Sequence, residues 1–262
     1  GSSIPEMLDE QVAAVLINHV DYRSGTLRDM ENLTRQVQEF GGLAVWDLSH
    51  SAGIYPVQLN RCRVDFAVGC TYKYLNGGPG APAYLYAASR HHTACNQPLS
   101  GWFGHARPFD FERHFDPDSG IRRFVCGTQP ILSLRALQSG LEIYQDVSLQ
   151  QVREKSMALT DLFIKLLKNE CAAWELEMIS PEDASQRGSQ VAVSHPQGYA
   201  VMQALISRGV IGDFRAPNLM RFGFAPLFLS YQDIHDAVKQ LKQILESKEW
   251  NQEAFLQKSK VT

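Results

Sequence analysis

The sequence predicts an α/β protein with two parts: a parallel-rich sheet over residues 1–150 and a small α+β domain over residues 151–262. In the first part, apolar and β-branched runs alternate with a helical pattern, which is typical of parallel strands joined by right-handed crossovers. In the second part, short strand-like runs and amphipathic helices follow one another without that alternation. We expect the joint between the two domains in helical sequence near residues 145–155.

The first domain is predicted to begin with a strand, a helix and a second strand. Residues 12–20 are apolar and β-branched enough for a buried strand. Residues 26–29 (Thr-Leu-Arg-Asp) form a helix-capping signature, and Gly41-Gly42 is expected to end the helix that follows. Residues 43–48, 64–71 and 83–88 are the next strand-like runs, and a glycine-rich turn lies at 77–80.

The rest of the chain divides into an irregular segment, a helical segment and a mixed one. An irregular connection as long as residues 90–128 is typical of a functional or interface-forming segment. Residues 129–171 are predicted to form two helices broken near Asp146. Beyond them we expect strands at 174–179, 190–194 and 218–224 and helices at 199–208 and 231–247.

Composition excludes several classes of protein. With 262 residues, 44% hydrophobic and 20% charged, the chain is globular, and a net charge of −3 gives no electrostatic reason to bind nucleic acid or an anionic membrane. No apolar run approaches the ~20 residues of a membrane span, and no secretory signal is visible. The 5 cysteines are odd in number and widely spaced, which predicts a reduced, cytoplasmic protein without disulfides. We expect no metal, because the histidines match no usual ligand spacing: His91, His92, His105 and His114.

Two residues stand at strand ends, where open parallel sheets bind ligands: Asp47 and Lys73. A lysine amine can bond covalently to the aldehyde of pyridoxal phosphate (PLP), and an aspartate can keep its pyridine nitrogen protonated. Each residue also has a simpler interpretation. Asp47 alone is more typical of a cap for the next segment through Ser49 or Ser51, and Lys73 alone of a solvated turn lysine. Their joint placement favours the PLP site.

Three neighbours extend the predicted site. Tyr72 can donate a hydrogen bond to a phosphate or a proton to a carbanion. His50 can bond the aspartate or the cofactor, or be a histidine satisfied by backbone at the start of the next segment. Asn18 ends the first strand, where it can bond the cofactor's ring oxygen or cap the following turn.

Five segments of the sequence resemble kynureninases of the bacterial type: WDLSHSAG, GCTYKYLNGGPGAPAYLY, PLSGWFGH, GIRRFVCGTQP and RGVIGDFRAPNLMRFGFAPLF. The resemblance covers the chain from about residue 5 to its C-terminus. It implies the aspartate aminotransferase fold of PLP-dependent transferases, PLP as cofactor and a homodimer. The implied activity is hydrolysis of L-kynurenine, or its 3-hydroxy form, to anthranilate and L-alanine in tryptophan catabolism.

The resemblance also assigns roles to single residues. Lys73 matches the Schiff-base lysine, Asp47 the pyridinium partner, and Tyr72 the phosphate-binding tyrosine that also donates a proton. Arg221 matches the arginine that clamps the substrate carboxylate, and Asn18 stands where family members have Ser or Thr. The phosphate pocket of the family draws on both subunits. All residues matched to the cofactor site are Asn18, Asp47, His50, Tyr72, Lys73, Trp102 and Thr128.

The chain departs from the family at its N-terminus. Family members continue further there, and that half supplies a phosphate loop, an aromatic stacked on the pyridine ring and more strands. We therefore expect a fragment that is inactive alone, whose other half is a separate chain or was removed. The alternatives are a class V aminotransferase, a cysteine desulfurase, for which Cys95 is the only candidate nucleophile, and a non-catalytic half-protein.

Overall fold

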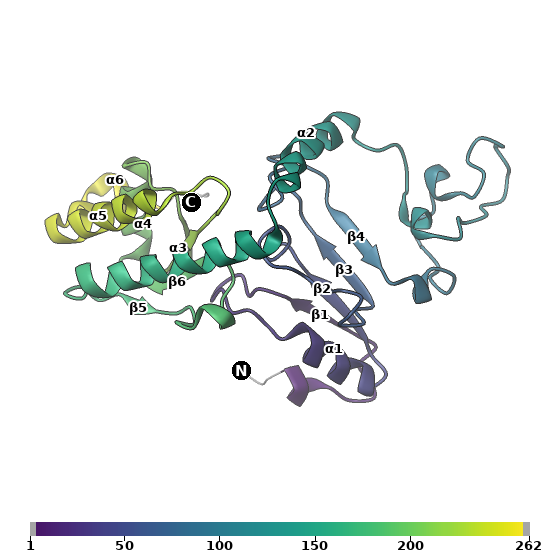
Figure 1. Ribbon diagram of the computed structural model, residues 1–262, viewed down its shortest axis with the longest axis horizontal. Helices are drawn as coiled ribbons and strands as arrows, with labels where there is room; N and C mark the ends of the chain where they lie inside the picture. Colours follow the sequence, from purple (N-terminus) through teal and green to yellow (C-terminus); the bar gives the residue numbers. More distant parts are fainter. Residues whose placement is uncertain (1–3, 259–262) are drawn as a thin grey trace. The chain divides into compact units, whose positions relative to one another are not determined.

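The computed structural model describes residues 4–258, which divide into two compact units (Figure 1). The first unit contains residues 4–19, 29–52 and 57–146, and the second contains 20–28, 53–56 and 147–258. Each unit has a sheet and a hydrophobic core of its own. The domain boundary expected at residue 150 stays a prediction.

The first unit is built on a four-stranded sheet with the order β1-β2-β3-β4. Its strands are β1 (Ala14–Asn18), β2 (Leu43–Asp47), β3 (Phe66–Gly69) and β4 (Tyr84–Ala87). The predicted parallel-rich sheet is confirmed, because β1 pairs with β2 and β2 with β3 in parallel. The pairing of β3 with β4 is antiparallel. No crossover helix separates these two strands, so the chain returns beside β3 as a hairpin.

Helix α1 (Met30–Glu39) connects β1 to β2, and its start differs from the prediction. The N-cap is Asp29, whose side chain accepts a hydrogen bond of 3.0 Å from the backbone N–H of Asn32. Thr26 does not cap the helix, because it forms a β-bridge with Arg187. Gly41 ends the helical segment as predicted, with a φ of +80° that favours glycine.

The core of the first unit is centred on Trp46. This indole is fully buried and donates a hydrogen bond of 2.9 Å from Nε1 to Oγ1 of Thr34 on α1. Because side chains alternate along a strand, Asp47 points to the sheet face opposite α1. The buried residues of this core are Ile17, Met30, Val37, Ala44, Trp46, Leu48, Val64 and Ala67.

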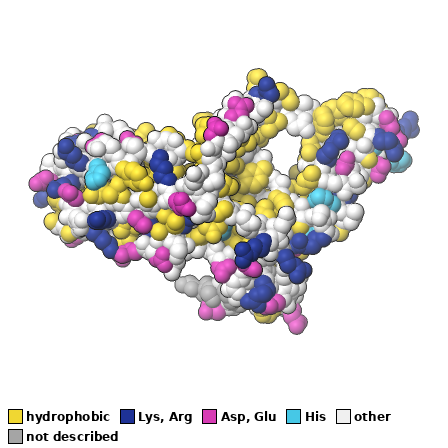
Figure 2. All heavy atoms as spheres, in the orientation of Figure 1, with side chains coloured by type: hydrophobic (Ala, Val, Ile, Leu, Met, Phe, Trp, Pro, Cys, Tyr) yellow, Lys and Arg dark blue, Asp and Glu magenta, His cyan; other side chains and the backbone are white. Residues whose placement is uncertain are grey.

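The long segment after β4 is irregular, as predicted. It contains only short 3₁₀ helices, η2 (Ser89–His91), η3 (Trp102–Gly104) and η4 (Ile121–Phe124), before α2 (Ile131–Glu142) begins. We call residues 99–126 the arm, since they project from the sheet in Figure 1. The two ends of the arm lie against each other: a Cβ added at Gly101 would come within 1.6 Å of the carbonyl oxygen of Cys126. Figure 2 shows hydrophobic side chains gathered over it, and those exposed are Leu99, Trp102, Phe109, Phe111, Phe115 and Ile121.

The helical segment that follows is broken where the sequence predicts. A 3₁₀ turn, η5 (Ile143–Gln145), extends α2 to Asp146, and α3 (Leu149–Glu170) begins after Ser148. Ser148 and Gln151 form a reciprocal capping box, which satisfies two backbone N–H groups at the start of α3.

The second unit contains an antiparallel sheet with the order β5-β6-β8-β7. Its strands are β5 (Glu177–Met178), β6 (Gln190–Ser194), β7 (Asp213–Arg215) and β8 (Leu219–Gly223), and its helices include α4 (Gly198–Ser207), α5 (Tyr231–Ser247) and α6 (Glu253–Leu256). The short elements are η6 (Ala184–Gln186), η7 (Glu249–Asn251) and, in the first unit, η1 (Ile4–Met7). The predictions for β6 and α5 are confirmed, whereas β7 and α6 were not predicted.

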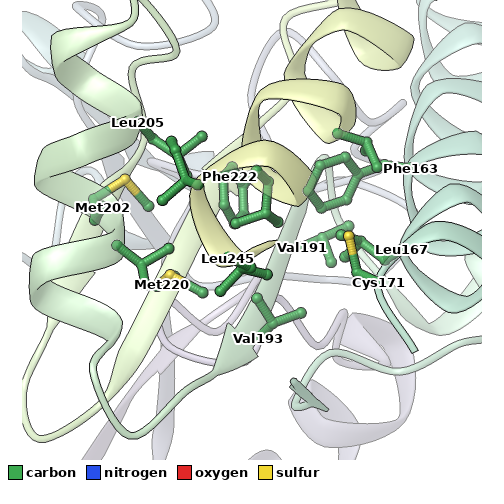
Figure 3. Packing of buried hydrophobic residues seen from close by; sticks show 14 of the residues in the cluster. Phe163, Leu167, Cys171, Val191, Val193, Met202, Leu205, Met220, Phe222 and Leu245 are labelled. Carbon is green, nitrogen blue, oxygen red and sulfur yellow. The ribbon is translucent and has the colours of Figure 1, made fainter. Parts of the chain in front are cut away.

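Aromatic and aliphatic side chains from α3, α4, α5, β6 and β8 form the core of the second unit (Figure 3). The rings of Phe163 and Phe222 lie 4.9 Å apart between centroids and join α3 to β8. Met202 and Leu205 of α4 are fully buried against the same sheet. This packing fixes β8, which carries Arg221.

No helix within residues 4–258 is both long and apolar enough to cross a membrane.

Candidate cofactor and substrate sites

The Asp47 carboxylate is fixed at the end of the first sheet by two neutral donors. Parallel pairing puts Asn18 directly beside Asp47, and the Asn18 amide donates to Oδ2 at 2.9 Å. The backbone N–H of Ser49 donates to Oδ1 at 2.8 Å, which is the capping contact considered from the sequence. Each carboxylate oxygen can accept more than one hydrogen bond, so both keep acceptor capacity. Asp47 can therefore cap the next segment and still accept a hydrogen bond from a bound cofactor.

Lys73 and His50, which follow β3 and β2 along the chain, lie in contact. Nζ of Lys73 lies 2.9 Å from Nε2 of His50. In the tautomer that has the ring proton on Nδ1, Nε2 of His50 can accept a hydrogen bond from the amine. This contact holds the lysine amine in one place.

The loop that carries Lys73 is held by its own backbone. The N–H of Gly77 donates to Thr71 O at 2.9 Å, and the N–H of Asn76 donates to Lys73 O at 3.0 Å. The Thr71 hydroxyl donates to Pro82 O at 2.5 Å and so closes the loop near its other end. A Cβ at Gly77 would lie 2.9 Å from Thr71 O, so a side chain there would displace the loop.

Tyr72 is half exposed beside the lysine. Nζ of Lys73 lies 5.5 Å from the centroid of its ring. The charge of the neighbouring Cys70, followed by burial, raises the pKa of the Tyr72 hydroxyl above its ordinary value. The phenol therefore keeps its proton at neutral pH and is available as a donor.

Tyr84 is a neighbour of the site that sequence reasoning missed. It stands opposite Gly69 in the β3–β4 hairpin, and a Cβ at position 69 would lie 2.3 Å from its hydroxyl oxygen. Burial first, then the charges of Cys70 and Asp47, raises the pKa of Tyr84 to about 12. Within residues 4–258 the hydroxyl is buried without a hydrogen-bond partner. Gly69 could have indicated this contact from the sequence, because a glycine inside a strand often marks a place where a neighbouring group comes close.

Trp102 and Thr128 lie in the irregular segment between β4 and α2. Both are exposed, and the Trp102 ring packs at 4.1 Å on Phe103 and at 5.8 Å on Phe109, measured between centroids. In the described part of the chain, no hydrogen bond or ring contact joins either residue to Lys73. Their assignment to a phosphate pocket stays a prediction.

Arg221 lies in the second unit, on β8, and is only 8% exposed. Its Nε donates to Oδ1 of Asp213 at 2.7 Å, and its Nη2 donates to Oδ2 of the same carboxylate. Its Nη1 donates to the carbonyl of Tyr22. Sequence reasoning missed Asp213, because no short β7 strand was expected to pair it with Arg221.

Among residues 4–258, no three His, Cys, Asp or Glu side chains are grouped closely enough to hold a metal ion.

The residues at the end of the first sheet fit PLP by their chemistry. Lys73 supplies a primary amine held by a contact of 2.9 Å with Nε2 of His50. Asp47 is a partly buried carboxylate without an ion-pair partner among the described residues, and its two hydrogen bonds come from neutral donors. A half-buried carboxylate is stabilised by a cation, which a protonated pyridine nitrogen would supply. Asn18 serves here to orient Asp47, and its contact with the cofactor oxygen stays a prediction.

Comparison with known sequences identifies the relatives of the chain. Residues 152–241 match the family described as the kynureninase C-terminal domain. The chain is 48% identical over 261 residues to a kynureninase of Burkholderia mallei (strain SAVP1), covering 100% of the chain and 63% of that protein. It is also 48% identical over 259 residues to a kynureninase of Pseudomonas fluorescens, covering 99% of the chain and 62% of that protein. The chain thus spans less than two thirds of the length of these relatives.

Comparison with solved structures identifies the fold. The apo cysteine desulfurase of Thermococcus onnurineus NA1 matches with a TM-score of 0.79 at 18% identity, covering 93% of this chain and 62% of that one. The alanine–glyoxylate aminotransferase of Nostoc sp. matches with a TM-score of 0.66 at 20% identity, covering 89% of this chain and 62% of that one. At such identities the likeness concerns the fold alone. The chain therefore shares the fold of about 62% of each of these two proteins, and its sequence is similar over its whole length to the two kynureninases above.

Proposed function

We propose that the complete protein containing this chain hydrolyses L-kynurenine, or its 3-hydroxy form, to anthranilate and L-alanine, with PLP bound at Lys73. The observation that carries the proposal is the contact between Lys73 and His50 beside the anchored Asp47. The 48% identity to kynureninases over the whole chain supports the choice of substrate. Because the chain covers 63% of such a relative, the activity is proposed for the complete protein.

PLP, when bound, would supply an aldehyde for covalent attachment and an electron sink for the negative charge that develops on the substrate. Lys73 would hold the aldehyde carbon through Nζ, and the acceptor Nε2 of His50 would orient that amine. Asp47 would keep the pyridine nitrogen protonated, and Asn18 and Ser49 hold its carboxylate for this contact.

The substrate would be bound and protonated by other residues of the chain. Arg221 would receive the α-carboxylate, since a guanidinium matches a carboxylate in a bidentate pair. Tyr72 keeps its proton at neutral pH and would donate it to the carbon left after the Cβ–Cγ bond breaks. A water molecule would add to the γ-carbonyl, which accounts for the hydrolytic outcome.

We further propose a cytoplasmic homodimer. The arm carries exposed apolar residues, among them Trp102, whose ring contacts among the described residues are with Phe103 and Phe109. Trp102 and the nearby Thr128 would then contribute to the phosphate pocket of a second subunit.

The decisive experiment uses the complete protein loaded with PLP. Release of anthranilate from L-kynurenine, followed by fluorescence, tests the reaction. Borohydride reduction followed by peptide mass spectrometry should find the phosphopyridoxyl group on Lys73. Lys73→Ala should abolish both signals, whereas Lys165→Ala, at an exposed lysine of α3, should change neither. Label on another lysine, or full activity in Lys73→Ala, contradicts the proposal.

A second candidate function is that of a cysteine desulfurase or class V aminotransferase, favoured by the TM-score of 0.79. Its only candidate nucleophile is Cys95, a half-buried thiol just after η2. Release of alanine from L-cysteine with transfer of its sulfur to Cys95 as a persulfide, which an added thiol such as dithiothreitol reduces to sulfide, would favour this function over that of a kynureninase if both are lost in Cys95→Ser. A chain that binds no PLP even in the complete protein would indicate a non-catalytic role.

A further inference from the structure

Asp213 and Arg221 form a paired unit on two neighbouring strands. They stand directly opposite each other in the antiparallel pairing of β7 with β8. Directly opposed side chains of antiparallel strands point to the same face, so the contact is built into the register. The Asp213 carboxylate accepts hydrogen bonds from Nε and Nη2 of Arg221. These two nitrogens form one edge of the planar guanidinium.

Arg221 is held on a second side by backbone. Its Nη1 donates to the carbonyl of Tyr22, which belongs to the same unit. A guanidinium has five N–H donors in a rigid plane, and these contacts use three of them. One hydrogen on Nη1 and one on Nη2 remain. The remaining Nη2 hydrogen points toward the edge shared with Nη1, because Asp213 occupies the edge shared with Nε.

The surroundings explain why such anchoring is needed. Arg221 is 8% exposed, so its charge is largely removed from water and requires a counter-ion. Asp213 also lies 3.6 Å from the guanidinium of Arg215, whose side chain is 42% exposed. Asp213 thus stands between two cations but forms its two-point contact with the buried one.

We propose that Asp213 is a positioning residue for substrate binding. It holds the plane of the Arg221 guanidinium through the Nε and Nη2 edge, so that the Nη1 and Nη2 edge faces the α-carboxylate of the substrate. Asp213 itself does not touch the substrate. The inference rests on the proposed function for the role of Arg221 and adds the residue that orients it.

The test compares three variants of the complete, PLP-loaded protein. Asp213→Ala should raise KM for L-kynurenine about tenfold, equivalent to ~1.4 kcal/mol, while kcat stays within about twofold. Asp213→Asn keeps one acceptor oxygen and should give a smaller rise. Asp161→Asn is the matched control, because it removes a carboxylate 2.6 Å from the fully buried Arg187 in the same unit. It should leave KM unchanged.

A binding measurement separates this inference from the proposed reaction. Calorimetry should show that the parent protein binds L-alanine more tightly than L-alaninamide, which lacks the carboxylate, and that Asp213→Ala reduces this preference about tenfold. An unchanged preference or unchanged KM in both Asp213 variants overturns the inference, as does an equal rise of KM in Asp161→Asn. If the parent releases no anthranilate, the proposed reaction fails, and the alanine comparison still decides the role of Asp213.

Discussion

Asp65 should make the free energy of unfolding of the first unit depend on pH in the acid range. Its carboxylate is 3% exposed and accepts hydrogen bonds from Gln38 at 2.9 Å, from the backbone of Ala44 at 2.9 Å, from Arg90 at 2.6 Å and from His91 at 2.8 Å. Burial alone would raise the pKa of Asp65, but these hydrogen bonds outweigh it and lower the pKa to about 2. The bonds join α1, β2 and the segment after β4.

The sign and size of the effect follow from the pKa of Asp65. A carboxyl whose pKa is lower in the folded chain stabilises the fold above the unfolded pKa of 3.8, and this contribution is lost as the pH falls toward about 2. A difference of about 1.8 pKa units corresponds to about 2 kcal/mol at neutral pH. Asp65→Asn removes the titrating group, so the variant should lose this pH-dependent part entirely.

The assay is urea unfolding of the chain, followed by circular dichroism at pH 7 and at several values down to pH 2. The difference in unfolding free energy between parent and Asp65→Asn should shrink by about 2 kcal/mol over this range. As a control, Asp236→Asn changes an exposed carboxylate of α5 in the second unit. This variant should have the same unfolding free energy as the parent at pH 7 and at pH 2. A difference between parent and Asp65→Asn that is constant from pH 7 to pH 2 would refute the reasoning.

Four further outcomes are expected. In the complete enzyme, Asp47→Asn should lower kcat about a thousandfold, ~4 kcal/mol of barrier, because an amide cannot stabilise a pyridinium; a rate near that of the parent contradicts this role. Arg221→Lys should lower kcat/KM for kynurenine through loss of the bidentate pair, and an unchanged value would remove Arg221 from the site. Gly69→Ala should destabilise the chain by about 1–3 kcal/mol in thermal unfolding, because its Cβ would lie 2.3 Å from the Tyr84 hydroxyl, and an unaltered melting temperature would show that the ring yields freely. The 262-residue chain alone, given PLP, should release no anthranilate, because it spans only 63% of the length of the kynureninase of Burkholderia mallei; measurable release would disprove this.

Much of the first sheet could be predicted because its strands are continuous apolar runs, which is typical of parallel strands covered by helices. The same logic put Asp47 and Lys73 at neighbouring strand ends, and the structure brings Lys73 to His50. The direction of β4 was not predictable from such runs, because periodicity does not report whether a connection crosses over or turns back. The start of α1 was misassigned for a related reason: Thr26 has the right chemistry for a cap, but a β-bridge holds it elsewhere.

The rest of the site depends on contacts between distant segments. Asp213 lies on a three-residue strand with too few positions to show a period, so its pairing with Arg221 appears only once the strands are aligned. The hydrogen bond from the Asn18 amide to Asp47 follows from strand register, which places the two residues side by side and which the sequence alone does not show. The hydroxyl of Tyr84 likewise lies near Asp47 only because a hairpin places Tyr84 opposite Gly69.

The short segment 20–28 has a consequence for anyone who dissects this chain. It belongs to the second unit although residues of the first unit flank it on both sides. Its backbone accepts hydrogen bonds from Gln190 at 3.1 Å, from Ser180 at 2.6 Å and from Arg221. A single protease cut after Asp146 would release a C-terminal product that lacks these acceptors. A folded version of that half therefore has to carry residues 20–28 as well, supplied as a peptide or fused by circular permutation.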